Sequence, residues 1–333
     1  MSTTYRHDAA AGIISLNRYA WAVTTRLLFC SDERYLDHLN STGHPESPDR
    51  LIAINQAIQR ESLVSHLELV APRRAEIGLV EAVHSQSYIE ELEQLCGAGG
   101  GALDADTGCV SASFDAALLA VGAAMTCVER LREEPDLSAG FCAVRPPGHH
   151  ARPHRAMGFC LFNTIAVVAR HLTSLGERVL IADFDAHHGN GTQEIFWNDP
   201  SVMFVSWHES PAYPGTGAVH ETGGSHAPGL TLNLNMAAGS SIGAYLATFD
   251  SATSAIEQFQ PTWLLMSAGF DAHRRDPLTN LGLVSRDFSR FAELLVPRVP
   301  RGRSVALLEG GYDLGALGES VSEFLGSLVT LST

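Results

Sequence analysis

The chain has 333 residues, 45% of them hydrophobic and 18% charged, which is enough for one large α/β domain with a buried core. Its net charge of −15 argues against nucleic acid as a partner, because phosphate binding needs a concentrated basic patch. No apolar run reaches the ~20 residues of a membrane span, and Arg6, Asp8 and Arg18 interrupt the apolar pieces near the N-terminus, so we expect a cytoplasmic protein without a membrane partner.

Short apolar runs alternate along the chain with longer amphipathic stretches. Several runs are apolar at every position, which is typical of parallel strands covered by helices on both faces. The predicted strands are 27–30, 67–70, 139–144, 178–183, 202–207, 230–235, 263–267 and 304–308. The predicted helices are 47–58, 113–132, 159–175, 241–259, 285–296 and 316–328.

This alternation predicts an α/β protein with three layers, in which helices cover both faces of a mostly parallel sheet. No linker interrupts the pattern. We therefore expect a single domain over 26–333, preceded by an N-terminal extension, 1–25, whose role the sequence does not indicate.

The cysteines are scattered and form no C-x-x-C pair. Most lie inside apolar runs, where a free thiol behaves as a small hydrophobic side chain. This argues against a disulfide framework and against a cysteine-based zinc site. The six are Cys30, Cys96, Cys109, Cys127, Cys142 and Cys160.

Dense polar groups and glycines follow four of the predicted strands. Ligands of parallel α/β sheets bind beyond the carboxyl ends of the strands, so these segments should meet at one edge. The segments are R-P-P-G-H-H at 145–150, D-F-D-A-H-H-G-N-G at 183–191, A-G-F-D-A-H at 268–273 and E-G-G-Y at 309–312.

Asp185 and His187 are the first candidate metal ligands. Residues two apart in extended chain point to the same side, so this carboxylate and this imidazole can reach one ion. Asp271, at the end of another strand, is the natural third ligand, and three protein ligands leave a zinc position open for water. An isolated D-x-H pair is more often a surface turn. The second aspartate and the tandem histidines favour the metal site instead.

His149 and His150 follow a restrained turn and can share general base and general acid work, since histidine titrates near neutral pH. Each needs a partner that fixes its tautomer, and Asp183 and Asn190 are the candidates. Tyr312 can point its hydroxyl at a substrate carbonyl and stabilise the developing oxyanion.

These motifs resemble those of the histone deacetylase superfamily. The similarity runs from His38, 44–46 and Arg50 through His84 to 310–312, and its most specific pieces are 145–150, M-G-F-C-L-F-N at 157–163, 183–192 and S-A-G-F-D-A-H at 267–273. The resemblance implies the arginase/deacetylase fold, with eight parallel strands.

The resemblance also implies a catalytic role for each residue of the site. His150 would be the general base and then the general acid, His149 paired with Asp183 would act electrostatically, and Tyr312 would bind the carbonyl oxygen. One catalytic zinc ion would be bound by Asp185, His187 and Asp271. A structural potassium ion would be bound by Asp183, Asp185, His187, Ser206 and Trp207, several of them through backbone oxygens. Substrate would be contacted by Phe159, Tyr213, Gly158, Leu278 and, at the rim, Asp106.

Asn190, 211–217 and 276–278 resemble class II members and bacterial relatives. Leu278 occupies the position where relatives that prefer acetylated polyamines carry a glutamate for a second ammonium group. The implied activity is therefore zinc-dependent hydrolysis of an N-acyl amide, acetyl in the first instance, on a lysine of a peptide or protein or on a small amine. A homo-oligomer is possible, as in bacterial relatives.

Three other functions compete with a lysine deacetylase. An acetylpolyamine amidohydrolase would use the same chemistry, and only a substrate assay separates it. A pseudoenzyme that binds acyl-lysine should lack a zinc ligand, a tandem histidine or Tyr312, and all of these are present. An arginase-like enzyme with two manganese ions is rejected, because Gly189 and His273 occupy positions where it needs carboxylates.

Overall fold

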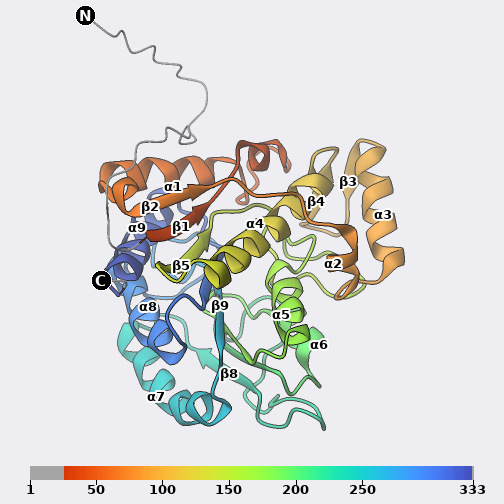
Figure 1. Ribbon diagram of the computed structural model, residues 1–333. Helices are drawn as coiled ribbons and strands as arrows, with labels where there is room; N and C mark the ends of the chain where they lie inside the picture. Colours follow the sequence, from red (N-terminus) through yellow and green to blue (C-terminus); the bar gives the residue numbers. More distant parts are fainter. Residues whose placement is uncertain (1–25, 332–333) are drawn as a thin grey trace, which may run out of the picture.

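A computed structural model describes residues 26–331 of the protein (Figure 1). Its main sheet has eight strands. The extension predicted for 1–25 lies outside the described residues. The strands are β1 (Arg26–Cys30), β2 (Leu67–Val70), β5 (Leu137–Cys142), β6 (Val179–Asp183), β7 (Val202–Glu209), β8 (Thr231–Met236), β9 (Trp263–Ala268) and β10 (Ser304–Leu308).

The strand order is β2-β1-β5-β10-β9-β6-β7-β8, and every pair of neighbours is parallel. The prediction of eight strands in a parallel sheet is confirmed, with strand ends displaced by no more than two residues. All positions of β5, β6, β7, β9 and β10 are buried, which explains why most of their residues are apolar.

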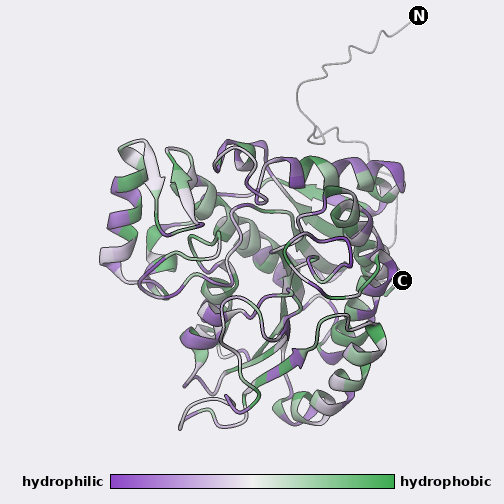
Figure 2. Ribbon diagram, turned by 180° about the vertical axis from the view of Figure 1, so that it is seen from behind, coloured by the Kyte–Doolittle hydropathy of each residue, from purple (hydrophilic) through white to green (hydrophobic). Residues whose placement is uncertain are grey.

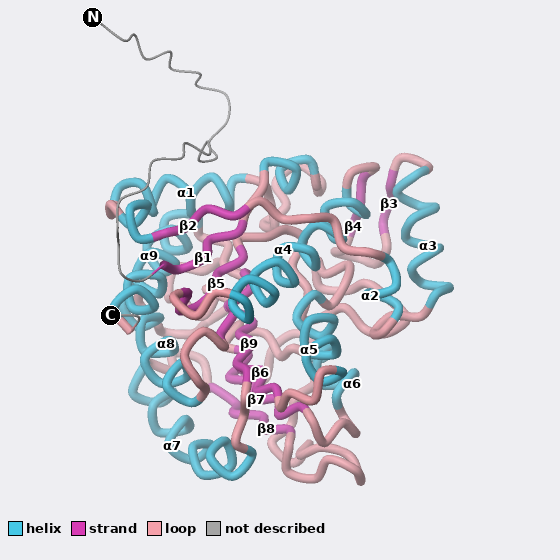
Figure 3. The backbone as a smooth tube through the Cα atoms, in the orientation of Figure 1, coloured by secondary structure: helices cyan, strands magenta, loops and turns pink. Residues whose placement is uncertain are grey.

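Helices cover both faces of this sheet (Figure 3). The helices α4 (Ser113–Glu133), α5 (Thr164–Ser174) and α6 (Asn190–Phe196) lie on one face. The other face is covered by α1 (Asp49–Arg60), α7 (Ile242–Phe259), α8 (Ser289–Leu295) and α9 (Leu314–Thr330). Figure 2 shows hydrophobic colour along the central strands, and hydrophobic and hydrophilic colours alternate along the helices.

The sequence reading missed the smaller elements. These are the helices α2 (Ile77–Glu81), α3 (Gln86–Gly97) and α6, the antiparallel hairpin of β3 (Gly100–Ala102) and β4 (Gly108–Val110), and the 3-10 turns η1 (Glu33–Asp37) and η2 (Leu63–His66). The helix predicted for 285–296 is divided into η3 (Ser285–Phe288), α8 and η4 (Val296–Arg298).

The helix predicted for 159–175 begins only at Thr164. Gly158 and Phe159 have φ angles of +56° and +68°, which an α-helix cannot contain. The Asn163 side chain then accepts a hydrogen bond from the Ala166 amide at 3.1 Å and caps the helix. The residues between the cap and Gly158 are left as a loop beside the site.

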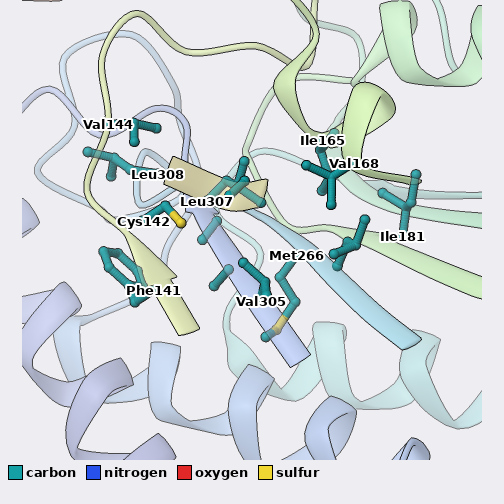
Figure 4. Packing of buried hydrophobic residues seen from close by; sticks show 14 of the residues in the cluster. Phe141, Cys142, Val144, Ile165, Val168, Ile181, Met266, Val305, Leu307 and Leu308 are labelled. Atoms are coloured by element: carbon teal, nitrogen blue, oxygen red, sulfur yellow. The ribbon is translucent and has the colours of Figure 1, made fainter. Parts of the chain in front are cut away.

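The core fills the space between the sheet and its helices. Ile165 and Val168 of α5 pack over Ile181 of β6, and Met266 and Val305 of neighbouring strands lie close by (Figure 4). The core fills the space on both faces of the sheet and so packs against the central strands that carry the site. Among the described residues no helix is both long and apolar enough to cross a membrane.

Candidate active site

The four segments predicted to carry the chemistry follow β5, β10, β9 and β6, which are consecutive neighbours in the sheet. Their carboxyl ends therefore lie side by side, as the sequence reading expected. Hydrogen bonds from backbone amides join the segments. The Phe270 amide donates to the Gly310 carbonyl at 3.0 Å, and the Ala186 amide donates to the side-chain oxygen Asp271 Oδ1 at 2.8 Å.

Asp185, His187 and Asp271 meet at this edge. One ligand atom of each lies within 4.8 Å of the others. Nδ1 of His187 lies 2.9 Å from Asp271 Oδ2 and 3.2 Å from Asp185 Oδ1. The local geometry differs from the prediction, because β6 ends at Asp183 and Asp185 to His187 form a bend rather than extended chain. The bend still turns both side chains toward Asp271.

The electrostatics of these three side chains are those of a metal site. Burial and the charge of Asp185 raise the pKa of Asp271 to about 7. Burial opposes a charge on Asp185 as well, but His149 and His187 outweigh it and lower the pKa of that carboxyl. Burial likewise opposes a charge on His187, and the two carboxylates raise its pKa well above the ordinary value. Two buried carboxylates and an imidazole thus face one another, which suits a divalent cation.

The backbone is shaped around these ligands. A Cβ atom on Gly310 would lie 2.3 Å from Asp271 Oδ2 and 2.7 Å from Asp185 Oδ2. The Gly310 amide instead donates to Asp185 Oδ2 at 2.7 Å and fixes that carboxylate. The residues present therefore fit the zinc ion that the sequence pattern implies.

His149 has a charged partner. Its Nδ1 donates to Asp183 Oδ2 at 3.0 Å, and both side chains are buried. Burial lowers the pKa of His149, but Asp183, Asp185 and Glu309 outweigh it and raise the value to about 10. These carboxylates thus favour the protonated form of His149.

His150 has a neutral partner. Its Nδ1 lies 2.8 Å from Asn190 Oδ1, and the Asn190 amide nitrogen contacts the Met157 sulfur at 3.4 Å. Nδ1 therefore donates, and Nε2 keeps its lone pair. Burial, followed by the charges of His149 and His187, lowers the pKa of His150 well below its ordinary value. The pKa values of these two adjacent rings, whose centroids lie 4.0 Å apart, are thus shifted in opposite directions.

Tyr312 is fixed at its backbone and at its ring. Its amide donates to Asp276 Oδ2 at 2.7 Å, and the Arg50 guanidinium lies 5.0 Å from its ring centroid. Phe159 packs edge-on against the same ring at 5.9 Å. The second oxygen of Asp276 accepts the Leu278 amide at 3.0 Å, so one carboxylate positions both residues.

Aromatic rings lie beside His150 and beside Tyr312. Tyr213 is half exposed, and its ring centroid lies 5.2 Å from that of His150. Phe159, which packs against the Tyr312 ring, is held by a hydrogen bond from its amide to Thr107 Oγ1 at 3.0 Å. Gly158 must lack a side chain, because a Cβ atom there would lie 2.4 Å from the His150 ring.

Asp106 lies at the rim beside Phe159. It is exposed, and its carboxylate accepts a hydrogen bond from Thr107 Oγ1 at 3.2 Å. Leu278 is 42% exposed on the loop after β9. Asp106 lies between β3 and β4, outside the four segments that bear the site, and the rim roles of Asp106 and Leu278 stay predictions.

The residues assigned to a potassium ion lie on β6, on β7 and in the bend after β6. Asp183 and Ser206 are register partners on the neighbouring strands β6 and β7. The Trp207 side chain is committed elsewhere, since its Nε1 donates to Thr248 Oγ1 at 3.1 Å. Backbone oxygens are thus the donors that Trp207 offers, and the ion itself stays a prediction.

Glu309 lies in the predicted segment 309–312, but no role was predicted for it. This buried carboxylate follows β10, and its Oε2 accepts the amides of Gly148 and His149 at 2.7 and 3.2 Å. It therefore holds the turn that carries the tandem histidines. A glutamate that ends an apolar strand just before two glycines was the available signal.

The group of Glu46, Arg50 and Arg145 was noted only as part of the resemblance. Arg145 donates to both oxygens of Glu46, and Arg50 donates to Glu46 Oε1 at 3.3 Å. Arg50 also donates to the backbone carbonyls of Glu309 and Gly311. This buried network joins α1 to two of the catalytic segments.

The structure agrees with rejection of a two-manganese site. A Cβ atom on Gly189 would lie 2.2 Å from Asp183 Oδ2, so a carboxylate side chain has no room there. The His273 imidazole is engaged away from the ligands, with the Arg275 amide at 3.1 Å and Ser285 Oγ at 3.3 Å.

The chain is similar to known proteins over most of its length. The family model described as Histone deacetylase domain matches residues 44–328. The chain is 42% identical over 295 residues to a "Probable deacetylase" of Methanothermobacter thermautotrophicus, covering 87% of each chain. It is 38% identical over 326 residues to "Histone deacetylase 10, chloroplastic" of Oryza sativa, covering 89% of this chain and 72% of that one. The crystal structure of the HDA15 HD domain matches with a TM-score of 0.88 at 32% identity, covering 92% of this chain and 89% of that one.

Proposed function

The chain belongs to the histone deacetylase family, and we propose that it removes an acetyl group from the side-chain amine of an acetylated lysine by metal-dependent hydrolysis. The observation that carries this proposal is the pairing of the tandem histidines. The two rings lie side by side next to the cluster of Asp185, His187 and Asp271, and His149 is paired with the carboxylate of Asp183 whereas His150 is paired with the amide of Asn190.

Asp185, His187 and Asp271 would hold a catalytic zinc ion. Zinc in such a site lowers the pKa of a bound water to about 7 and acts as a Lewis acid toward a carbonyl oxygen. We propose that Asp183, Asp185, His187, Ser206 and Trp207 hold a structural potassium ion, largely through the backbone oxygens that this ion favours.

His150 is the proposed general base and acid. Its low pKa keeps Nε2 unprotonated at neutral pH, so it can accept a proton from the attacking water. The Asn190 oxygen holds the proton on Nδ1 and thereby fixes this tautomer. Once it has gained the proton, the same nitrogen delivers it to the leaving amine.

His149 is the proposed electrostatic partner. Because Asp183 keeps it protonated, it cannot accept the water proton. Its positive charge lies where negative charge develops on the substrate, and a buried charge acts strongly there because water is excluded.

Tyr312 is the proposed donor to the carbonyl oxygen. Asp276 fixes its backbone and Arg50 supports its ring, so the hydroxyl is held in place before the substrate arrives. Such preorganisation is what makes an oxyanion donor effective.

Phe159 and Tyr213 would flank the aliphatic stem of an acetyl-lysine, with Gly158 and Leu278 shaping the entrance and Asp106 binding the peptide backbone. The apolar Leu278 favours a substrate without a second ammonium group. One observation favours the alternative, an acetylated polyamine. Asp106 and its neighbour Asp104 are both exposed at this rim. The pKa of Tyr213 is raised mainly by burial, and the charges of these two aspartates raise it further.

The test is acetate release from an acetyl-lysine peptide and from acetylated polyamines, measured side by side at matched concentrations. The proposal predicts a kcat/KM that is higher for the peptide. A preference for the polyamine would contradict the assigned substrate and keep the chemistry. No release from either substrate by zinc-loaded protein would contradict the enzyme and favour a protein that only binds acyl-lysine.

A further inference from the structure

A second group of metal-binding side chains adjoins the catalytic cluster. His149, Cys160 and Glu309 each place one ligand atom within 4.8 Å of the others, and all three side chains are buried. They come from three segments of the chain: the turn after β5, the loop before α5 and the end of β10. The fold, rather than a local motif, brings these donors together.

Each of the three side chains has donor capacity left for an ion. Glu309 uses Oε2 for two backbone amides, whereas its buried Oε1 has no hydrogen-bond partner. His149 donates Nδ1 to Asp183, and its Nε2 becomes a ligand when a bound ion displaces the proton from this nitrogen. The Cys160 thiol donates to the Gly158 carbonyl at 3.3 Å, and this proton is the one that a metal ion replaces.

The chemistry of the group selects a particular class of ion. One sulfur, one imidazole nitrogen and one carboxylate oxygen suit a borderline or soft divalent ion such as Zn²⁺, Cd²⁺ or Co²⁺, and do not suit Mg²⁺ or Ca²⁺. A thiolate and a carboxylate carry two negative charges, so they neutralise a bound divalent ion in the buried site. The catalytic cluster, in contrast, contains no sulfur.

We propose that His149, Cys160 and Glu309 form a second, inhibitory binding site for a thiophilic divalent cation, filled when zinc or cadmium is in excess. Binding would engage Nε2 of His149 and so remove this side chain from catalysis. The inhibitory effect rests on the proposed deacetylase function. The binding site itself does not.

Cobalt titration tests the site without an activity assay. Co²⁺ bound by Asp185, His187 and Asp271 has no thiolate ligand, so a thiolate-to-cobalt charge-transfer band in the near ultraviolet reports a cysteine ligand. We expect the band to grow with the second equivalent of Co²⁺ in the wild type and in Cys142→Ser, a matched control for a buried cysteine. It should be absent from Cys160→Ser.

Glu309→Gln provides a second variant that keeps an oxygen for the two backbone amides. Its affinity for the second Co²⁺ should fall by at least ~10-fold, the lower range for loss of a group that supports a metal. Absence of the band from the folded wild type, or its persistence in Cys160→Ser, would overturn the site.

The inhibitory role is tested by acetate release at increasing Zn²⁺ beyond one equivalent. Wild type and Cys142→Ser should be inhibited in parallel, whereas Cys160→Ser should need at least ~10-fold more Zn²⁺ for the same inhibition. Equal inhibition of all three proteins would overturn the regulatory role. If no protein releases acetate, the proposed function fails, while the cobalt band still decides whether the second site exists.

Discussion

Replacing Asn190 by Asp changes the charge beside His150 with almost no change in shape. In the wild type, the neutral amide oxygen lies 2.8 Å from Nδ1, and burial with neighbouring positive charges keeps the pKa of His150 low. The activity of the wild type should therefore persist below pH 6.5, the ordinary pKa of histidine. A carboxylate at the same place favours the protonated ring and raises this pKa.

The magnitude follows from Coulomb's law. Two unit charges 4 Å apart interact by ~4 kcal/mol at an effective dielectric constant of 20. At ~1.4 kcal/mol per pKa unit, the ceiling is an upward shift of ~3 units. Burial of the new carboxylate removes part of this energy. We expect the acidic limb of kcat/KM to move upward by at least ~1 pH unit in Asn190→Asp.

The assay is kcat/KM for acetate release from an acetyl-lysine peptide between pH 5 and 9, at a fixed metal content. Asn190→Ala is the matched control, because it removes the acceptor without adding a charge. Asn190→Ala should lower kcat/KM, and the pH of its acidic limb should be unchanged or lower than in the wild type. An Asn190→Asp limb that does not move, or that moves to lower pH, would refute the assignment of His150 as the base.

Three further substitutions test other parts of the site and the fold. Tyr312→Phe should lower kcat by ~100- to 1,000-fold and leave bound zinc unchanged, since one oxyanion donor is lost; near-full turnover would contradict its role. Asp271→Ala should lose zinc on dialysis, as measured by elemental analysis, and retained zinc would exclude Asp271 as a ligand. Glu46→Gln removes the counter-charge of the buried Arg145 and should destabilise the fold by ~3–5 kcal/mol in urea unfolding. Burial raises the pKa of Glu46, but Arg145 outweighs this effect and lowers the pKa from 4.5 to about 2. The stability that this carboxylate supplies to the wild type is therefore present above pH 4.5 and is lost as the pH falls toward 2. Glu46→Gln should not show this loss.

The sheet could be predicted because its central strands are buried on both faces. Ile181 and Met266 belong to runs that are apolar at every position, and such runs need no periodicity to be recognised. The small elements around the site lack this signal. Helix α6 has only seven residues and begins within the polar motif at Asn190, and β3 and β4 have three residues each.

The sequence predicted which residues lie together in the candidate site better than it predicted their local backbone geometry. Sequence reasoning placed Asp185 and His187 in extended chain, whereas the strand ends two residues earlier and a bend brings them together. The partners of His149 and His150 were correctly anticipated, because Asp183 and Asn190 lie in the same motif. No role was predicted for Glu309 because its contacts are with backbone amides of a segment 160 residues away.

The most direct test of the central claim is metal reconstitution of acetate release. The purified protein is stripped with a chelator, dialysed, and titrated with Zn²⁺ while acetate from an acetyl-lysine peptide is measured, with Asp271→Ala as the control. The account predicts that chelation abolishes activity, that one equivalent of Zn²⁺ restores it, and that Asp271→Ala recovers none. Full activity in the metal-free protein, or equal recovery in Asp271→Ala, would contradict it.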